Sequence, residues 1–271
     1  AEKGDYYVDD AELANIRFMT EHYQNCIVLL NVGGIIDLTE LKKIEGVKAL
    51  VLVGQTGNIG GYSVADVLTA KTYPSGKLTD TWAKSYDEYP SSATFSYRNG
   101  DLDDEYYSDG IYVGYRYFDT FGVPVRYGFG FGLSYTEFEI SDYCLENVSA
   151  EKITISATVK NTGKVSGKEV VQIYVSLPGG ILEKEARRLC AYTKTSELKP
   201  GESEKVSLVI DMNQLTSYDE KRAAWILEGG FYGIWAGNSL ASAKLCAGVK
   251  LDKEVISCQV KNLFPLKQKL E

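Results

Sequence analysis

Histidine is almost absent from the chain: among 271 residues there is one, His22, in a stretch whose pattern predicts a helix. A histidine-based zinc site or a Ser-His-Asp triad needs a properly placed imidazole, and a single histidine in a predicted helix argues against both kinds of site. The five cysteines are scattered and form no Cys-x-x-Cys pair. We therefore expect no metal and no cofactor, and we interpret the cysteines as small buried side chains in a reducing compartment, the cytoplasm.

Positive charge and long apolar runs are also missing. The net charge is −8, whereas nucleic-acid phosphates demand patches of lysine and arginine, so we expect no nucleic-acid partner. The longest apolar run, residues 26–32, has the length of a strand and is too short to cross a bilayer, so we expect no membrane partner. What is present is ordinary globular composition, with 44% hydrophobic residues and a length that favours two domains.

The first half of the chain alternates helical and strand patterns. Asp9 and Asp10 can cap the first helix, and continuous apolar runs predict buried strands. Strands that alternate with helices imply βα units, so we predict an α/β domain with a mostly parallel sheet flanked by helices. The strands are expected at residues 26–32 and 48–53, and the helices at 10–24, 38–44 and 63–70.

From about Thr136 the pattern changes to short strands in which polar and apolar residues alternate. This alternation, most evident at 152–159, 169–176 and 204–210, predicts an all-β sandwich of the fibronectin type III or immunoglobulin type. The last stretch is amphipathic and predicts a helix or the start of a linker. The expected segments are an α/β domain at 1–135, the sandwich at 136–250 and a tail or linker at 251–271.

An aromatic-rich connector at 86–135 forms the last part of the α/β domain. A loop region this aromatic predicts either a domain–domain interface or the wall of a binding cleft. Its aromatic residues include Tyr106, Tyr107, Tyr112, Tyr115, Tyr117, Phe118, Phe121, Tyr127, Phe129 and Phe131.

Two segments invite a chemical interpretation. The glycine-rich residues 54–61 follow a predicted strand, but no Gly-Lys-Ser/Thr follows and the spacing is not Gly-x-Gly-x-x-Gly, which favours a tight turn with close backbone approach over a phosphate loop. The acidic residues of 101–109 lie beside tyrosines that could stack on a sugar, and glycosidic cleavage usually requires two carboxyl groups. The alternative is a solvated acidic loop, and the residues alone favour that alternative.

Four segments resemble, in order, motifs of glycoside hydrolase family 3, the β-glucosidase and β-xylosidase family. The resemblance covers about residues 5–250. The segments are Val28–Gly33 (VLLNVG), Gly60–Leu68 (GGYSVADVL), Pro74–Leu78 (PSGKL), and the pair Asp109–Asp119 (DGIYVGYRYFD) and Tyr127–Tyr135 (YGFGFGLSY).

The resemblance implies part of a retaining, exo-acting β-glycosidase of the β-glucosidase type, which hydrolyses terminal β-linked sugars. It places the nucleophilic Asp on a separate TIM-like barrel and the acid/base Glu in a loop at or before Ala1. This chain then carries neither catalytic residue and is inactive alone; Glu2 is the closest acidic residue and is not assigned the role. Ile59 and Asp109 stand where relatives often have Glu.

The connector loops are expected to close over a β-glucoside or small oligosaccharide bound mainly by the barrel. The candidate substrate-binding residues are Asp109, Tyr107 and Tyr112, and Arg116 is interpreted as a structural bridge between loops. The barrel's place, before or after this segment, stays open, and the expected source is bacterial. The second hypothesis is a non-catalytic carbohydrate-binding or interaction module that reuses the architecture.

Overall fold

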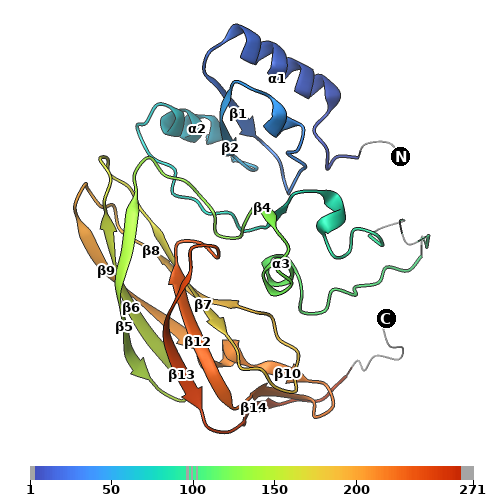
Figure 1. Cartoon of the computed structure of the whole chain (residues 1–271), viewed down its shortest axis with the longest axis vertical. Coiled ribbons are helices and arrows are strands. Elements are labelled where there is room, and N and C mark those ends of the chain that lie inside the picture. The colour runs from blue at the N-terminus through green and yellow to red at the C-terminus, as the bar shows by residue number, and fades with distance from the viewer. Residues whose placement is uncertain (1–3, 96–97, 99, 102, 264–271) are drawn as a thin grey trace. The chain divides into compact units, whose positions relative to one another are not determined.

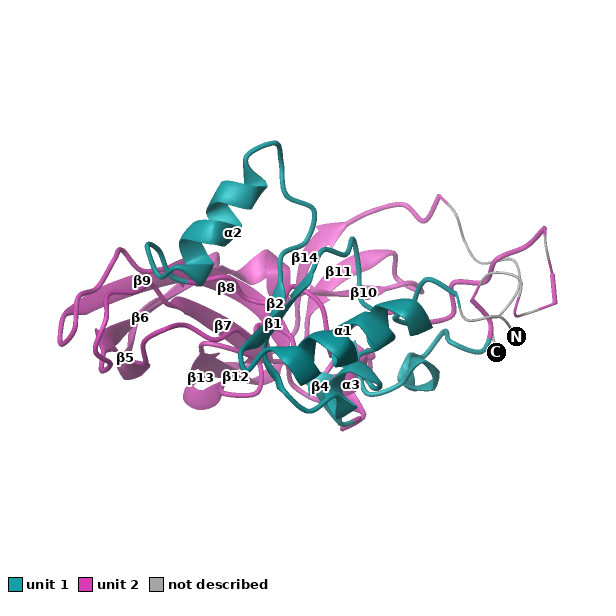
Figure 2. Cartoon of the chain, turned by 90° about the horizontal axis from the view of Figure 1, so that it is seen from above, with its two compact units in different colours: residues 1–73, 82–93, 124–127 teal, residues 74–81, 94–123, 128–271 magenta. Residues whose placement is uncertain are grey.

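The computed structural model describes residues 4–95, 98, 100–101 and 103–263, which form two compact units (Figure 2). The chain passes from one unit to the other several times before its second half begins. Unit 1 consists of residues 1–73, 82–93 and 124–127, and unit 2 of residues 74–81, 94–123 and 128–271.

The first helix of unit 1, α1 (Asp10–His22), begins where the sequence predicts. Asp9 is its N-cap: the carboxylate accepts the Ala11 N–H at 2.7 Å, and the Glu12 carboxylate accepts the Asp9 N–H at 3.2 Å. This reciprocal capping box satisfies backbone N–H groups that have no partner inside the helix. The predicted helix start is confirmed, and the helix ends two residues before the predicted Gln24.

Strands β1 (Cys26–Leu30) and β2 (Val47–Leu52) form a two-stranded parallel sheet in unit 1 (Figure 1). Both strands lie where the apolar runs predict them. The prediction that they are buried throughout is wrong, since Ile27 remains 47% and Leu29 41% exposed. The physical reason is that this sheet has two strands, and the described residues do not cover both of its faces.

The predicted mostly parallel sheet is also wrong. β1 and β2 are the one parallel pair of strands within the described residues, and the other paired strands are antiparallel. A third parallel strand does not follow α2 (Gly60–Leu68), because Leu78 pairs its backbone instead with Gly130 and Phe131, both at 2.8 Å. The next strand, β3 (Trp82–Ala83), pairs antiparallel with β4 (Val125–Tyr127).

The glycine-rich segment packs closely against itself where it enters α2. A Cβ on Gly60 would lie 2.0 Å from the Thr56 Oγ1 atom, so only glycine fits at this position. This agrees with the tight-turn interpretation. The predicted helix at 38–44 is reduced to a short 3₁₀ turn, η1 (Leu41–Lys43), since so short a segment cannot complete a stable α-helix. A second 3₁₀ turn, η2, spans Tyr86–Glu88.

Unit 2 is built around an antiparallel β-sandwich, as the alternating pattern predicts. One sheet has the order β5-β6-β9, the second β13-β12-β7-β8, and a third, smaller sheet β10-β11-β14. The strands are β5 (Phe138–Val148), β6 (Lys152–Asn161), β7 (Val170–Ser176), β8 (Arg188–Lys194), β9 (Ser203–Asp211), β10 (Ser217–Asp219), β11 (Ala224–Leu227), β12 (Gly230–Gly237), β13 (Lys244–Leu251) and β14 (Val255–Gln259), with η4 (Met212–Leu215) before β10 and α3 (Tyr115–Thr120) in the connector.

The sandwich core is formed by the inward side chains of the two larger sheets. Ile153, Ile155 and Val159 of β6 face Ile173 and Ile234 of the opposite sheet in one buried apolar cluster. Every second residue of β6 enters the core, which is the period expected of a strand with one buried face. The packing therefore explains why sequence alternation predicts this half of the chain well.

Strand β7 departs from simple alternation because both of its faces are buried. Gln172 and Tyr174 point away from the sandwich core, yet each is almost fully covered. Tyr115 and Phe129 of the connector pack in a cluster with Tyr174, and the Gln172 amide donates to the Gly130 carbonyl at 3.4 Å. The connector thus supplies a second layer on this sheet, which supports the interface interpretation of its aromatic residues.

The final described strand occupies part of the predicted tail. Residues 255–259 form β14, a strand that pairs antiparallel with β11, and not a helix. The helix interpretation of the amphipathic pattern is therefore wrong for these residues, since the partner strand β11 supplies a sheet edge that the sequence pattern does not reveal. Residues 264–271 lie outside the described residues.

Candidate functional site

Two of the three candidate substrate-binding residues lie in one tight turn of the connector. The Tyr112 N–H donates to the Asp109 carbonyl at 2.9 Å, and Gly110 between them has a φ of +57°. A residue with a side chain is disfavoured at that backbone angle, so the glycine fixes the turn. Tyr107 lies upstream with its ring 84% exposed. The structure thus brings Asp109 and Tyr112 together and leaves the Tyr107 side chain in solvent.

The Tyr112 side chain contacts the connector and a loop of the sandwich. Its ring meets Phe121 edge-on, with 4.9 Å between ring centroids. Burial, and then a hydrogen bond to the Glu183 carboxylate, raise the pKa of the Tyr112 hydroxyl. The hydroxyl therefore stays protonated and can donate a hydrogen bond to the carboxylate.

The acidic cluster at 101–109 folds back on itself. The Asp101 carboxylate accepts the backbone N–H groups of Asp103 at 2.9 Å and Asp104 at 3.2 Å. Asp103, Asp104 and Glu105 are exposed, and Leu102 lies outside the described residues. This is the geometry of a solvated acidic loop, in which an Asp side chain closes a local turn.

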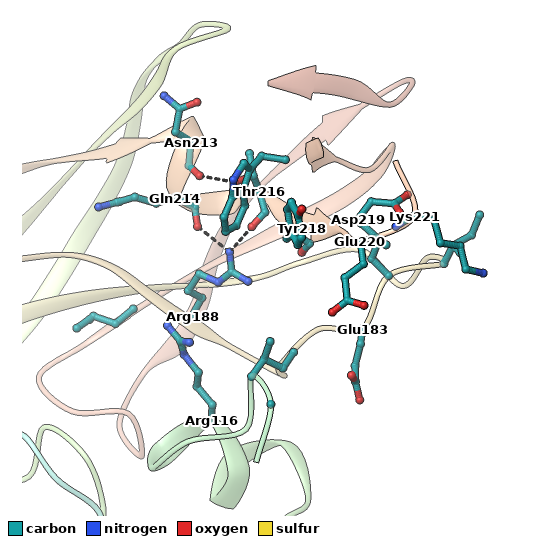
Figure 3. Close-up of a pocket in the computed structure, with 17 residues that line it drawn as sticks. Arg116, Glu183, Arg188, Asn213, Gln214, Thr216, Tyr218, Asp219, Glu220 and Lys221 are labelled. Atoms are coloured by element: carbon teal, nitrogen blue, oxygen red, sulfur yellow. Dashed lines mark hydrogen bonds between the residues drawn. The ribbon is translucent and has the colours of Figure 1, made fainter. Parts of the chain in front are cut away.

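A cleft of about 930 Å³ lies in unit 2 beside the turn at residues 109–112 (Figure 3). Its walls come from three segments of the chain: residues 110–116 of the connector, 181–189 before and within β8, and 213–225 from η4 to β11. Pockets of this size accommodate small molecules. Asp109 and Tyr107 do not line it, whereas Gly110, Ile111 and Arg116 do.

A buried ion-pair network forms the floor of the cleft. The Arg188 guanidinium donates to both oxygens of Glu185, at 2.6 and 3.0 Å, and Arg116 Nε lies 3.5 Å from the same carboxylate. Arg188 also donates to the carbonyls of Gln214 and Thr216, both at 2.8 Å. Figure 3 shows Arg188 reaching these carbonyls, with Arg116 next to it. Arg116 therefore bridges the connector and the sandwich loop, in agreement with the structural role expected for it.

The network holds Glu185 ionised. Burial works against ionisation, but the Arg188 and Arg116 guanidinium groups outweigh burial, so the pKa of the Glu185 carboxyl lies below its usual range. The side chain is 0% exposed. A carboxylate locked in this way by a bidentate partner orders the loop and is not free to exchange protons with a substrate.

The family-like motifs of the connector are attached to the sandwich by a second ion pair. Arg187 donates through Nε to Asp119 at 2.9 Å, a second nitrogen bonds the other carboxylate oxygen, and Nη1 reaches the Leu240 carbonyl at 3.1 Å. The guanidinium also lies over the Trp235 ring, 5.2 Å from its centroid. Asp119, the last residue of the GYRYFD segment, therefore has a structural partner.

Lys77 of the PSGKL segment is attached in the same way. Its ammonium lies 2.7 Å from Glu169 Oε1, with both side chains largely buried. The other Glu169 oxygen accepts the Asn238 amide at 2.9 Å. A Cβ on Gly132 would lie 2.3 Å from the Gly76 carbonyl, so this glycine allows the two segments to approach closely. The motif residues Lys77 and Gly132 thus serve packing within unit 2.

Other site types have no support among the residues that the structure describes. No group of three or more His, Cys, Asp and Glu side chains in that part of the chain could hold a metal ion. Each helix there is too short or too polar to cross a lipid bilayer. Glu2 lies outside the described residues.

Sequence reasoning missed the cleft residues contributed by the sandwich. Tyr218 and Trp225 lie opposite one another on β10 and β11, with their ring centroids 5.2 Å apart. Two aromatic residues on strands that flank the turn segment 220–223 are a hairpin signal with a paired aromatic face, and this signal could have identified them. The charged residues 183–188 give no comparable signal, because a charge run usually predicts a solvated surface.

Comparison with known proteins agrees with this architecture. Residues 2–135 match the glycosyl hydrolase family 3 C-terminal domain, and residues 169–240 match the fibronectin type III-like domain. β-Glucosidase A of Butyrivibrio fibrisolvens is 40% identical over 96% of this chain and 34% of its own length. The structure of a β-glucosidase from Paenibacillus barengoltzii superposes with a TM-score of 0.88 at 35% identity, over 96% of this chain and 30% of that one.

A further solved structure gives the same result. β-Glucosidase 3B from Thermotoga neapolitana, determined in complex with glucose, has a TM-score of 0.86 and 38% identity over 94% of this chain and 35% of its own. The chain spans about a third of the length of the curated relatives named above. It belongs to glycoside hydrolase family 3, of which it comprises the C-terminal domain and a fibronectin type III-like domain.

Proposed function

We propose that this chain is part of a retaining, exo-acting β-glucosidase that hydrolyses terminal β-linked glucosides. The observation that carries the proposal is the match of nearly the whole chain, 96%, to a β-glucosidase at 40% identity. Retaining cleavage uses a nucleophilic carboxylate and a second carboxyl group that acts first as acid and then as base. Both are proposed to lie outside this chain, the nucleophile on a TIM-like barrel of the parent protein.

The structural role of the buried carboxylates supports this placement. Glu185 is ion-paired with Arg188, Glu169 with Lys77 and Asp119 with Arg187. Carboxylates held by a cation in this way support the walls of a site better than they support proton transfer. The chain alone is therefore proposed to be inactive.

Asp109, Tyr107 and Tyr112 are proposed to contact substrate in the intact enzyme. Tyr107 offers an exposed ring for stacking, and the tight turn holds Asp109 and Tyr112 in a fixed relation. The proposed segments remain an α/β domain at 1–135, a sandwich at 136–250 and a tail or linker at 251–271. The family match to residues 2–135 supports the first boundary.

The cytoplasm of a bacterium is the proposed location, since the free cysteines of the described residues suit a reducing compartment.

An aryl β-glucoside assay tests the proposal. We expect the purified 271-residue chain to release no phenol above the buffer background, and the parent protein with its barrel to hydrolyse the substrate with retention of anomeric configuration. The matched control is the same purification from cells that lack the gene. Turnover by the purified chain would contradict the placement of the carboxyl groups, and an inactive parent would favour the non-catalytic module.

A further inference from the structure

The cleft in unit 2 has an aromatic wall. Tyr218 and Trp225 occupy opposite positions of an antiparallel strand pair, so their side chains lie on the same face of the β10-β11-β14 sheet. Their ring centroids are 5.2 Å apart, and Trp225 is 43% exposed. The Trp225 ring therefore offers an accessible aromatic surface that its neighbour Tyr218 holds in place.

The charges around the cleft are balanced. Arg188 is neutralised by Glu185, and Asp219 is neutralised by Arg222, whose Nε lies 2.6 Å from its carboxylate. Three cationic and three anionic side chains line the cleft, namely Arg116, Arg188 and Lys221 against Glu183, Asp219 and Glu220. A cleft without excess charge gives no electrostatic preference for an anion or a cation, and therefore suits a neutral ligand.

Several polar groups in the cleft are free to bind a ligand. Among the residues that the structure describes, the side chains of Gln214, Glu220 and Lys221 and the Tyr218 hydroxyl have no hydrogen-bond or ion-pair partner. Together these groups include both donors and acceptors. Figure 3 shows Tyr218, Glu220 and Lys221 on one side of the cleft, across from Glu183, with Gln214 at the other end of the view.

We propose that this cleft binds a neutral saccharide, with a pyranose ring lying against Trp225. One face of a pyranose presents C–H groups that pack on an aromatic ring, while its hydroxyls both donate and accept hydrogen bonds. Gln214 and the Tyr218 hydroxyl, lining the same cleft, bind those hydroxyls. The proposal does not rest on the proposed function, because binding at this cleft requires no catalytic carboxyl group.

Tryptophan fluorescence of the whole 271-residue chain tests the proposal. Of the three tryptophans, Trp82 is buried and Trp235 is partly covered, with the Arg187 guanidinium over its ring, so the exposed Trp225 is the one most open to quenching by iodide. We expect cellobiose and cellotetraose, at concentrations up to about 20 mM, to protect this signal, and Trp225→Ala to weaken oligosaccharide binding measured by calorimetry at least about tenfold. Tyr192→Ala is the matched control, since Tyr192 is an exposed aromatic on β8 that does not line the cleft.

The design separates the proposal from its alternatives. Gln214 is exposed, so Gln214→Ala should weaken binding without changing the thermal unfolding midpoint. This variant tests the proposal even if Trp225→Ala fails to fold. Absence of binding by every neutral oligosaccharide would overturn the proposal. So would equal affinity in both variants and the unaltered chain, or tighter binding of glucuronate or glucosamine than of glucose. The outcome is independent of whether the parent protein hydrolyses glucosides.

Discussion

Strand β6 of unit 2 buries Ile153, Ile155 and Val159 completely, whereas strand β1 of unit 1 leaves Ile27 and Leu29 nearly half exposed. Both strands are rich in β-branched and aliphatic residues, so their composition does not explain the difference. The sandwich supplies a facing sheet for β6, while in the described part of unit 1 strand β1 pairs with β2 alone, and β3 and β4 form a separate two-stranded sheet. Burial is thus a property of the layer that faces a strand, and a two-stranded sheet is marginal by itself.

The largest expected effect on stability comes from a cavity in the sandwich core. Ile155→Ala should lower the free energy of unfolding by about 3–4 kcal/mol, because it leaves a cavity between two packed sheets. Leu29→Ala, the matched change in unit 1, should cost less than about 1 kcal/mol, since its side chain is already partly in water. Urea unfolding of both variants measures the difference. Equal losses would contradict the contrast between the units.

The next effect concerns the ion pair beneath the cleft. Glu185→Gln should cost about 3 kcal/mol at neutral pH, because it leaves the Arg188 guanidinium without its buried partner. Glu254→Gln removes an exposed partner of Arg222 and serves as the control, for which we expect a much smaller change. Urea unfolding at neutral pH measures both.

The pH dependence of this loss has a defined sign. The pKa of Glu185 is lower in the folded chain than in the unfolded chain, so its contribution is complete above the ordinary pKa of about 4.3. It is lost as the pH falls toward the folded value, because the unfolded chain takes up the proton first. The stability gap between the unaltered chain and Glu185→Gln should therefore shrink as the pH falls from about 5 to about 3. A gap that widens on acidification would contradict the assignment.

The smallest expected effect is local to unit 1. Asp9→Ala removes the capping box of α1 and should cost about 1 kcal/mol. Amide hydrogen exchange should accelerate in the first turn of α1 and stay unchanged in β6. Glu21→Ala, an exposed change in the last turn, is the control. Faster exchange throughout the sandwich would show that the two units unfold together.

The sequence predicted strand and helix positions better than it predicted their surroundings. The cap at Asp9 and the alternation in β6 are local signals, and each is found in the structure. The direction of strand pairing is not local: Leu78 could have continued a parallel sheet, but it pairs with the segment 128–131 about 50 residues later. Apolar runs likewise do not specify which layer covers them, so burial of β1 was predicted wrongly.

The candidate site was predictable only where its residues lie close together in sequence. Asp109 and Tyr112 share a turn and were identified together, whereas the cleft combines the connector with segments about 70 and 100 residues away. The sequence around Arg188 and Glu185 is typical of a charged surface, because no sequence pattern near them indicates that the connector folds over them. The family resemblance supplied what these residues could not.

The burial of β7 on both of its faces determines where the chain can be divided into separate folding pieces. Tyr174 packs with Tyr115 and Phe129, and the Gln172 amide donates to the Gly130 carbonyl; these three connector residues precede the sandwich strands in the chain. A sandwich cut away at residue 136 would uncover the face of that tyrosine on which Tyr115 and Phe129 pack, and the Gln172 amide would lose the Gly130 carbonyl and keep only the Asn238 carbonyl as an acceptor. The smallest portable piece is therefore the sandwich together with its connector, and recombination between genes is expected to preserve that larger piece intact.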